Sequence, residues 1–292
     1  MKKLLLLALA AWTVNAQAKL EIEIVQGNAA QLPIAVVPFQ WRAASPAPIT
    51  GVAEIASADL YRSGLFAPVD EEDMVDHPAD FESVRFGTWR LLKVDYLAIG
   101  SVVDSPSGGY DIIYQLYDVH TQEELLSQVT TVGEGDLRFG AHRVADAIYE
   151  KLTGVPGAFA TRIAYVSATG LGKDLHYELV VADADGWDPR TVVGSPEPLL
   201  SPAWSPDGAR LAYVSFEQGN SAIFMQEVAT GARELVSGAT GINGAPAFSP
   251  DGKYIAMTLS AGGNPEVYVR DLSNGVSRQL TTHWAIDTEP LW

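Results

Sequence analysis

The sequence predicts two regions of different fold class, an α/β domain over residues 19–157 and a repetitive all-β region over residues 158–292. Two observations support this division. Helical and strand-like apolar patterns alternate through the first region, and the helical period disappears from about Thr161 onward. In the second region, "SPAWSPDGARLAYVSF" at 201–216 is followed 44 residues later by "APAFSPDGKYIAMTLS" at 245–260.

Residues 1–18 have the composition of a secretory signal peptide. Two lysines precede the apolar run Leu4–Trp12, and the small-x-small pattern Ala16-Gln17-Ala18 follows. The apolar run is too short to cross a bilayer as a helix, which needs roughly 20 residues. We therefore expect cleavage before Lys19 and an exported, soluble mature protein.

The composition excludes several classes of site. The chain has no cysteine, so thiolate metal sites, cysteine nucleophiles, disulfides and lipid attachment at a cysteine are absent. The net charge is −17, and it becomes −19 when the two lysines of residues 1–18 are removed. A chain this acidic is not attracted to nucleic acid or to anionic membranes, whereas a basic protein partner would fit.

The first region predicts a small sheet covered by helices. The expected elements, in order, are a strand at 34–39, a helix at 49–63, strands at 96–103 and 110–119, a third strand at 124–132 and a helix at 141–152. The last two strands are expected to form a hairpin. Gly64 and Gly154 follow the two helices and are expected to end them.

The second region has the repeat expected of a β-propeller. Each 44-residue unit contains four short strand patterns, which corresponds to one blade. In "SPDG", proline presets φ, aspartate bonds to its own backbone and glycine supplies a positive φ, so the motif predicts a turn. An earlier unit lacks the first strand, and "TEPLW" at 288–292 would be the first strand of a third copy. We therefore expect an incomplete propeller, truncated within the ring.

The motifs "VVPFQW", "RIAYVS", "SPAWSPDG", "NGAPAFSPDG" and "IDTEPLW" occur in an order that resembles the TolB family, periplasmic components of the Tol–Pal system of Gram-negative bacteria. The resemblance implies an α/β domain followed by a six-bladed propeller, of which about half is present. It also implies a monomeric, non-enzymatic periplasmic protein without a cofactor or a metal. Such a protein would link TolA to the outer-membrane lipoprotein Pal, support envelope integrity and division, and possess further outer-membrane partners.

The resemblance also implies two binding surfaces. Pal would dock at the channel mouth, on Leu200, Ser201, Ile242, Asn243, Gly244, Ala245, Asp287, Thr288 and Glu289. TolA would bind the segment Lys19, Leu20, Glu21, Ile22, Glu23, Ile24 and Val25. The residues themselves leave alternatives open, because the loops could serve only to cross between blades. The alternating segment could equally be the first strand of the chain's own sheet.

The same residues bear on other functions. A propeller scaffold for another envelope partner stays open, since fold does not fix function. A serine hydrolase is disfavoured because no Gly-x-Ser-x-Gly motif occurs. "TGLGKDL" at 169–175 lacks the first glycine of a phosphate loop, and "DADGWD" at 183–188 lacks the last acid of a calcium loop and is interpreted as a turn. The histidines are scattered and predict no zinc site: His77, His120, His142, His176 and His283.

Overall fold

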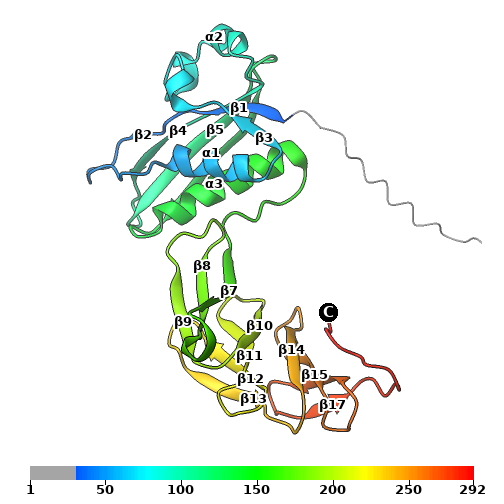
Figure 1. Cartoon of the computed structure of the whole chain (residues 1–292). Helices are drawn as coiled ribbons and strands as arrows, with labels where there is room; N and C mark the ends of the chain where they lie inside the picture. The colour runs from blue at the N-terminus through cyan, green and yellow to red at the C-terminus, as the bar shows by residue number, and fades with distance from the viewer. Residues whose placement is uncertain (1–30) are drawn as a thin grey trace, which may run out of the picture.

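A computed structural model describes residues 31–292, which form an α/β domain followed by three antiparallel sheets (Figure 1). In the α/β domain the elements are β1 (Leu32–Val36), β2 (Gln40–Trp41), α1 (Val52–Arg62), β3 (Phe66–Pro68), α2 (Phe86–Leu91), β4 (Tyr96–Asp104), β5 (Tyr110–Asp118), β6 (Glu124–Val132) and α3 (Leu137–Thr153). Within the described residues, no helix is both long and apolar enough to cross a membrane.

The six strands of this domain form one mixed sheet. Its order is β3-β1-β4-β5-β6, and β2 continues alongside β4. The β1 strand pairs in parallel with β3 and β4, and β4, β5 and β6 follow one another in antiparallel pairs. The hairpin predicted for the last two strands is confirmed, and β6 has the predicted bounds. The sequence did not predict β2, β3 or α2.

Helices cover both faces of the sheet because its strands alternate their apolar side chains. Ile34 and Val36 of β1 pack with α1 and α3 on one face, while Ala35 and Val37 pack with α2 on the other. Figure 1 shows α1 and α3 side by side across the sheet. Gly154, with φ of 76°, ends α3 as predicted.

The repetitive region consists of blade-like sheets, which confirms a partial propeller. The first sheet has three strands, β7 (Arg162–Thr169), β8 (His176–Asp183) and β9 (Arg190–Ser195). Each of the next two has four: β10 (Leu199–Trp204), β11 (Arg210–Ser215), β12 (Ala222–Glu227) and β13 (Arg233–Ser237), then β14 (Asn243–Phe248), β15 (Tyr254–Leu259), β16 (Glu266–Asp271) and β17 (Ser277–Gln279).

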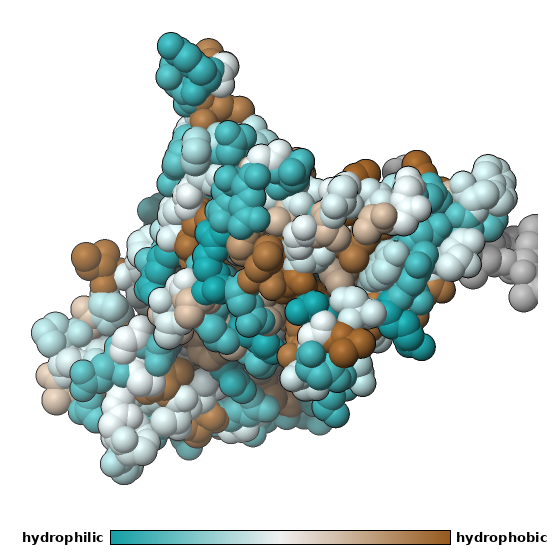
Figure 2. All heavy atoms as spheres, turned by 90° about the horizontal axis from the view of Figure 1, so that it is seen from below, coloured by the Kyte–Doolittle hydropathy of each residue, from teal (hydrophilic) through white to brown (hydrophobic). Residues whose placement is uncertain are grey.

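The middle sheet is buried on both faces by its neighbours. In β11, Leu211 and Tyr213 pack toward the first sheet, whereas Ala212 and Val214 pack toward the third. This explains why the inner strands are almost continuously apolar instead of alternating with polar residues. On the face seen from below, separate apolar groups lie among polar residues (Figure 2).

The SPDG turns form as predicted. Asp207 accepts hydrogen bonds from the Ser205 hydroxyl and the Ala209 N–H, and Gly208 has φ of 66°. Asp251 makes the equivalent bonds in the next repeat. The serine hydroxyl and the backbone N–H hold the pKa of both carboxyls below the usual range. The turns are therefore stabilised above the unfolded-state pKa of aspartate, and that stabilisation is lost as the pH falls through the lowered values.

The strand expected at 288–292 does not form, so this prediction is wrong for the described structure. None of the strands in the described residues pairs with this segment. Instead, the Trp292 indole N–H donates to the Ala247 carbonyl at 2.9 Å, and its ring stacks on Tyr254.

Candidate functional site

Three segments at equivalent places in the repeat, residues 199–202, 242–246 and 287–290, share an unusual backbone conformation, and we call them the entry segments. They were predicted to be loops, but the first two lie largely within β10 and β14. Ser201, Ala245 and Glu289 occupy the same position in successive repeats, and their φ angles are 49°, 47° and 53°. Side chains other than glycine avoid this left-handed region, at a cost of about 1–2 kcal/mol per residue. Each residue precedes a proline, and the first two lie where the hairpin register shifts. Strain of this kind concentrates at functional positions.

Several of the predicted Pal-contact residues are exposed on the entry segments. The side chains of Leu200 and Ile242 are 48% and 52% exposed, although both are apolar. Ser201, Thr288 and Glu289 are exposed as well. The sheets that carry the first two entry segments are neighbours, since β10 contacts β14. The arrangement offers apolar side chains and one carboxylate on a backbone held by strands.

Asn243 and Ala245 differ from this group because both are buried. The Asn243 carboxamide accepts from the Ser237 hydroxyl at 2.6 Å and donates to the Ser221 carbonyl at 2.9 Å. It therefore connects two sheets internally, and its side chain is not available at the surface. The remaining predicted positions, Gly244 and Asp287, are partly exposed.

The segment expected to bind TolA, Lys19–Val25, lies outside the described residues, as do residues 1–18.

The left-handed conformation gives a testable prediction at Ser201. Replacing this exposed serine with glycine is expected to raise the free energy of unfolding by about 1 kcal/mol, because glycine adopts positive φ without a steric cost. Glu234→Gly, at an exposed position of β13 outside the left-handed region, serves as the matched control and should lower stability by about 0.5–1 kcal/mol. Urea unfolding measures the change in the free energy of unfolding for both variants, which is expected to be positive for Ser201→Gly and negative for Glu234→Gly. A destabilised Ser201→Gly variant would contradict the interpretation.

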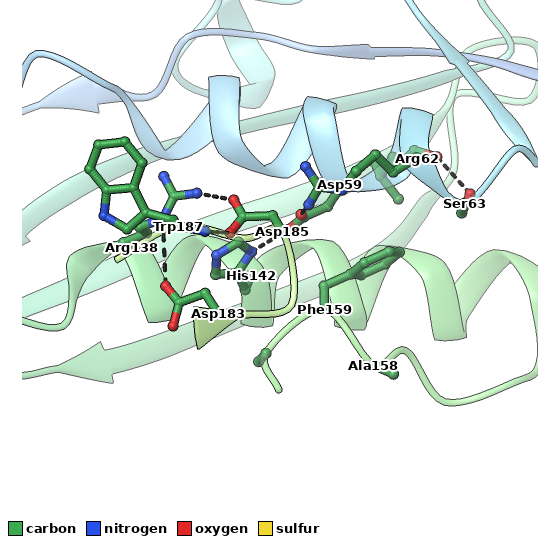
Figure 3. A network of polar contacts seen from close by, with 12 residues as sticks. Asp59, Arg62, Ser63, Arg138, His142, Ala158, Phe159, Asp183, Asp185 and Trp187 are labelled. Carbon is green, nitrogen blue, oxygen red and sulfur yellow. Dashed lines mark hydrogen bonds and ion pairs between the residues drawn. The ribbon is translucent and has the colours of Figure 1, made fainter. Parts of the chain in front are cut away.

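A second polar site joins the two domains (Figure 3). Asp59 of α1 is completely buried and pairs with Arg62. The Nδ1 atom of His142, a buried residue on α3, lies 2.6 Å from the other Asp59 carboxylate oxygen. The turn between β8 and β9 approaches the same place and contributes Asp183 and Asp185.

Arg138 of α3 connects this turn to the α/β domain. Its guanidinium pairs with Asp185, its Nε lies 3.6 Å from Asp183, and it stacks on the Trp187 ring at 4.7 Å. Burial opposes ionisation of Asp185, but the Trp187 N–H and the Arg138 charge outweigh it and keep the pKa of that carboxyl below its usual value. We call this set of residues the joint cluster: Asp59, Arg62, Arg138, His142, Asp183 and Asp185.

The sequence did not predict the joint cluster. The "DADGWD" motif is a turn, as expected, and it is the tertiary structure that brings its acids to α3. One available indication was His142, a polar residue next to the apolar stripe predicted for residues 141–152.

Comparisons with known proteins decide the family. The family model described as the TolB amino-terminal domain matches residues 20–125, and the one described as the TolB beta propeller domain matches residues 149–292. The chain belongs to the TolB family. This TolB-family chain is 52% identical over 229 residues to the proteins named "Tol-Pal system protein TolB" from Xanthomonas campestris and Xanthomonas oryzae, over 78% of its own length.

A solved structure of a TolB protein supports the same assignment. The crystal structure of TolB from Acinetobacter baumannii superposes on the TolB-family chain with a TM-score of 0.76 and 39% identity, covering 88% of this chain and 62% of that one. The chain spans about half the length, 52%, of the curated relatives it matches.

Proposed function

We propose that the chain is a non-enzymatic, periplasmic interaction component of the Tol–Pal system that binds Pal at the entry segments and TolA through residues 19–25. It would thereby link the two partners in maintaining the envelope and constricting the outer membrane at division. The observation that carries the proposal is the left-handed backbone at Ser201, Ala245 and Glu289. Membership of the TolB family supports it, as does the name of the Xanthomonas relatives, Tol-Pal system protein TolB.

The exposed side chains of the entry segments are of kinds that suit binding to a protein. The exposed apolar side chains of Leu200 and Ile242 can become buried on binding, which is the main favourable contribution to association. Glu289 provides an exposed carboxylate at the equivalent position of the next repeat, and the acidic chain as a whole would attract a partner with a basic surface. The backbone is already held in the conformation that would be bound, so binding would cost less conformational entropy.

Binding measurements with purified Pal and with the C-terminal domain of TolA test the proposal. Ile242→Ala is expected to weaken Pal binding by about tenfold, the effect of truncating an apolar residue at an interface centre. Val276→Ala truncates a valine of the β16–β17 turn that is 64% exposed, and it should leave the affinity unchanged within a factor of about two. Equal changes in Pal affinity for the two substitutions would exclude the entry segments as the Pal site.

The second arm of the experiment concerns the N-terminal segment. Deletion of Lys19–Gln31 should abolish TolA binding and leave Pal binding largely intact. Equal loss of both would show that the segment is structural. If the undeleted protein retains neither partner, the chain serves a different envelope protein and the proposed function is wrong.

A further inference from the structure

We propose that the joint cluster is a binding site for a divalent transition-metal ion of the Zn²⁺ class, with His142, Asp183 and Asp185 as ligands. One nitrogen of His142 and one carboxylate oxygen of each aspartate all lie within 4.8 Å of one another. Imidazole nitrogen with carboxylate oxygen is a ligand set that zinc accepts. The three residues come from α3 of the α/β domain and from the β8–β9 region of the propeller, so the ion would join the two domains.

The strongest observation is the unpaired nitrogen of His142. The side chain is only 2% exposed, and its Nε2 atom is buried without a hydrogen-bond partner. Leaving such an atom unsatisfied costs about 1–3 kcal/mol, so it requires a ligand or another partner. In Figure 3 the ring lies between Asp59 on one side and the aspartates of the turn on the other.

Asp59 determines what this nitrogen can bind. Its carboxylate accepts the Nδ1–H of His142 at 2.6 Å and is itself held by Arg62. In a neutral imidazole the Nε2 atom then carries a lone pair. The carboxylate oxygens of Asp183 and Asp185 lie within 4.8 Å of a nitrogen of this ring. A lone pair among acceptors is matched by a cation. A carboxylate on the far nitrogen is also the usual outer-shell arrangement of metal-ligating histidines.

The charges of the joint cluster favour the same conclusion. Three carboxylates face two guanidinium groups, those of Arg62 and Arg138, so with a neutral His142 the charges balance when a divalent ion takes the place of the Arg138 guanidinium. Ligand atoms around tetrahedral zinc are about 3.3 Å apart for bonds of about 2.0–2.1 Å, so atoms that lie up to 4.8 Å apart need to approach one another by up to about 1.5 Å. Asp183 can rotate because its side chain is 34% exposed.

Arg138 is the competitor for this site. It pairs with Asp185, but its contact with Asp183 is long at 3.6 Å and its Nε has no hydrogen-bond partner. The Trp187 ring, 4.7 Å from the guanidinium carbon, provides an alternative position for the displaced cation. The ion and the guanidinium therefore exchange, and removing the arginine charge should strengthen metal binding.

The test is a titration of the tag-free full chain, freed of metal with a chelator, with Co²⁺ followed by visible absorption and with Zn²⁺ followed by calorimetry. We expect one ion per chain. Asp183→Asn should weaken binding by more than about tenfold, and Arg138→Gln should strengthen it by about tenfold, because one loses a ligand and the other a competitor. Asp188→Asn changes an exposed carboxylate of the same turn and should have no effect.

Opposite shifts for Asp183→Asn and Arg138→Gln distinguish this site from adventitious binding to surface histidines, which neither substitution alters. Circular dichroism confirms that each variant is folded. The proposal is overturned if neither the unsubstituted chain nor Arg138→Gln shows saturable binding, or if Asp183→Asn and Asp188→Asn behave alike. It is also overturned if nitrogen-15 spectra taken with Zn²⁺ present show a His142 ring with protons on both nitrogens.

Discussion

Replacing Asp59 with alanine is expected to lower the free energy of unfolding of the α/β domain by about 3–5 kcal/mol. The carboxylate is fully buried and accepts from both Arg62 and His142. Its removal leaves a guanidinium without its partner and a buried imidazole without its acceptor. The loss comes mainly from His142, which is buried and has already lost its hydration, whereas the Arg62 side chain is 43% exposed and can be hydrated again.

Urea unfolding followed by circular dichroism measures the change, and hydrogen exchange assigns it to α1 and α3. Asp76→Ala is the matched control, since Asp76 pairs with an exposed arginine, Arg85, in the same domain at 2.8 Å. That surface pair should contribute no more than about 1 kcal/mol. A loss at Asp59 as small as the loss at Asp76 would show that the joint cluster does not stabilise the domain.

Gly100→Ala should be nearly as damaging, with an expected loss of about 3 kcal/mol. A Cβ atom at this position of β4 would lie 2.6 Å from the Ile113 carbonyl oxygen and 2.6 Å from the Phe39 ring. The ring can move, but the carbonyl belongs to the neighbouring strand β5, so the two central strands have to separate. Hydrogen exchange should show faster opening in both strands.

Two further variants test that explanation. Gly135→Ala adds a methyl group where nothing lies within 4 Å, and it should change stability by less than about 0.5 kcal/mol. Adding Phe39→Leu to Gly100→Ala relieves only the contact with the ring, so it should recover only part of the loss. Full recovery would mean that the strand pairing is not disturbed by the substitution.

Local patterns in the sequence were enough to predict the elements that depend on local chemistry. The alternation in β5 and the glycine after α3 are examples, as are the two SPDG turns. By contrast, α2 was missed because its six residues show less than two turns of helical period. Its position depends on Phe86 and Trp89 packing against the sheet, which is a tertiary contact.

The candidate sites show the same limit. The repeat register located Ser201, Ala245 and Glu289 at equivalent positions, but none is a glycine, so a left-handed backbone could not be predicted there. Exposure could not be predicted within "INGAP" either, where Ile242 is half exposed and its neighbour Asn243 is buried. The joint cluster depends on contacts between domains that no local pattern encodes.

The chain between the two domains has a mechanical consequence. Residues 155–161 could extend by about 24 Å if they were free. Instead, the Asp146 carboxylate of α3 accepts from the backbone N–H groups of Phe159 and Ala160 at 2.7 and 3.1 Å, and the Phe159 ring packs edge-on against Tyr149. A connector fixed in this way has little slack. Tension applied to one domain would act on the contacts between α3 and the connector before the connector lengthened. The first event under a pulling force would therefore be the breaking of the Asp146 hydrogen bonds and the Phe159–Tyr149 contact.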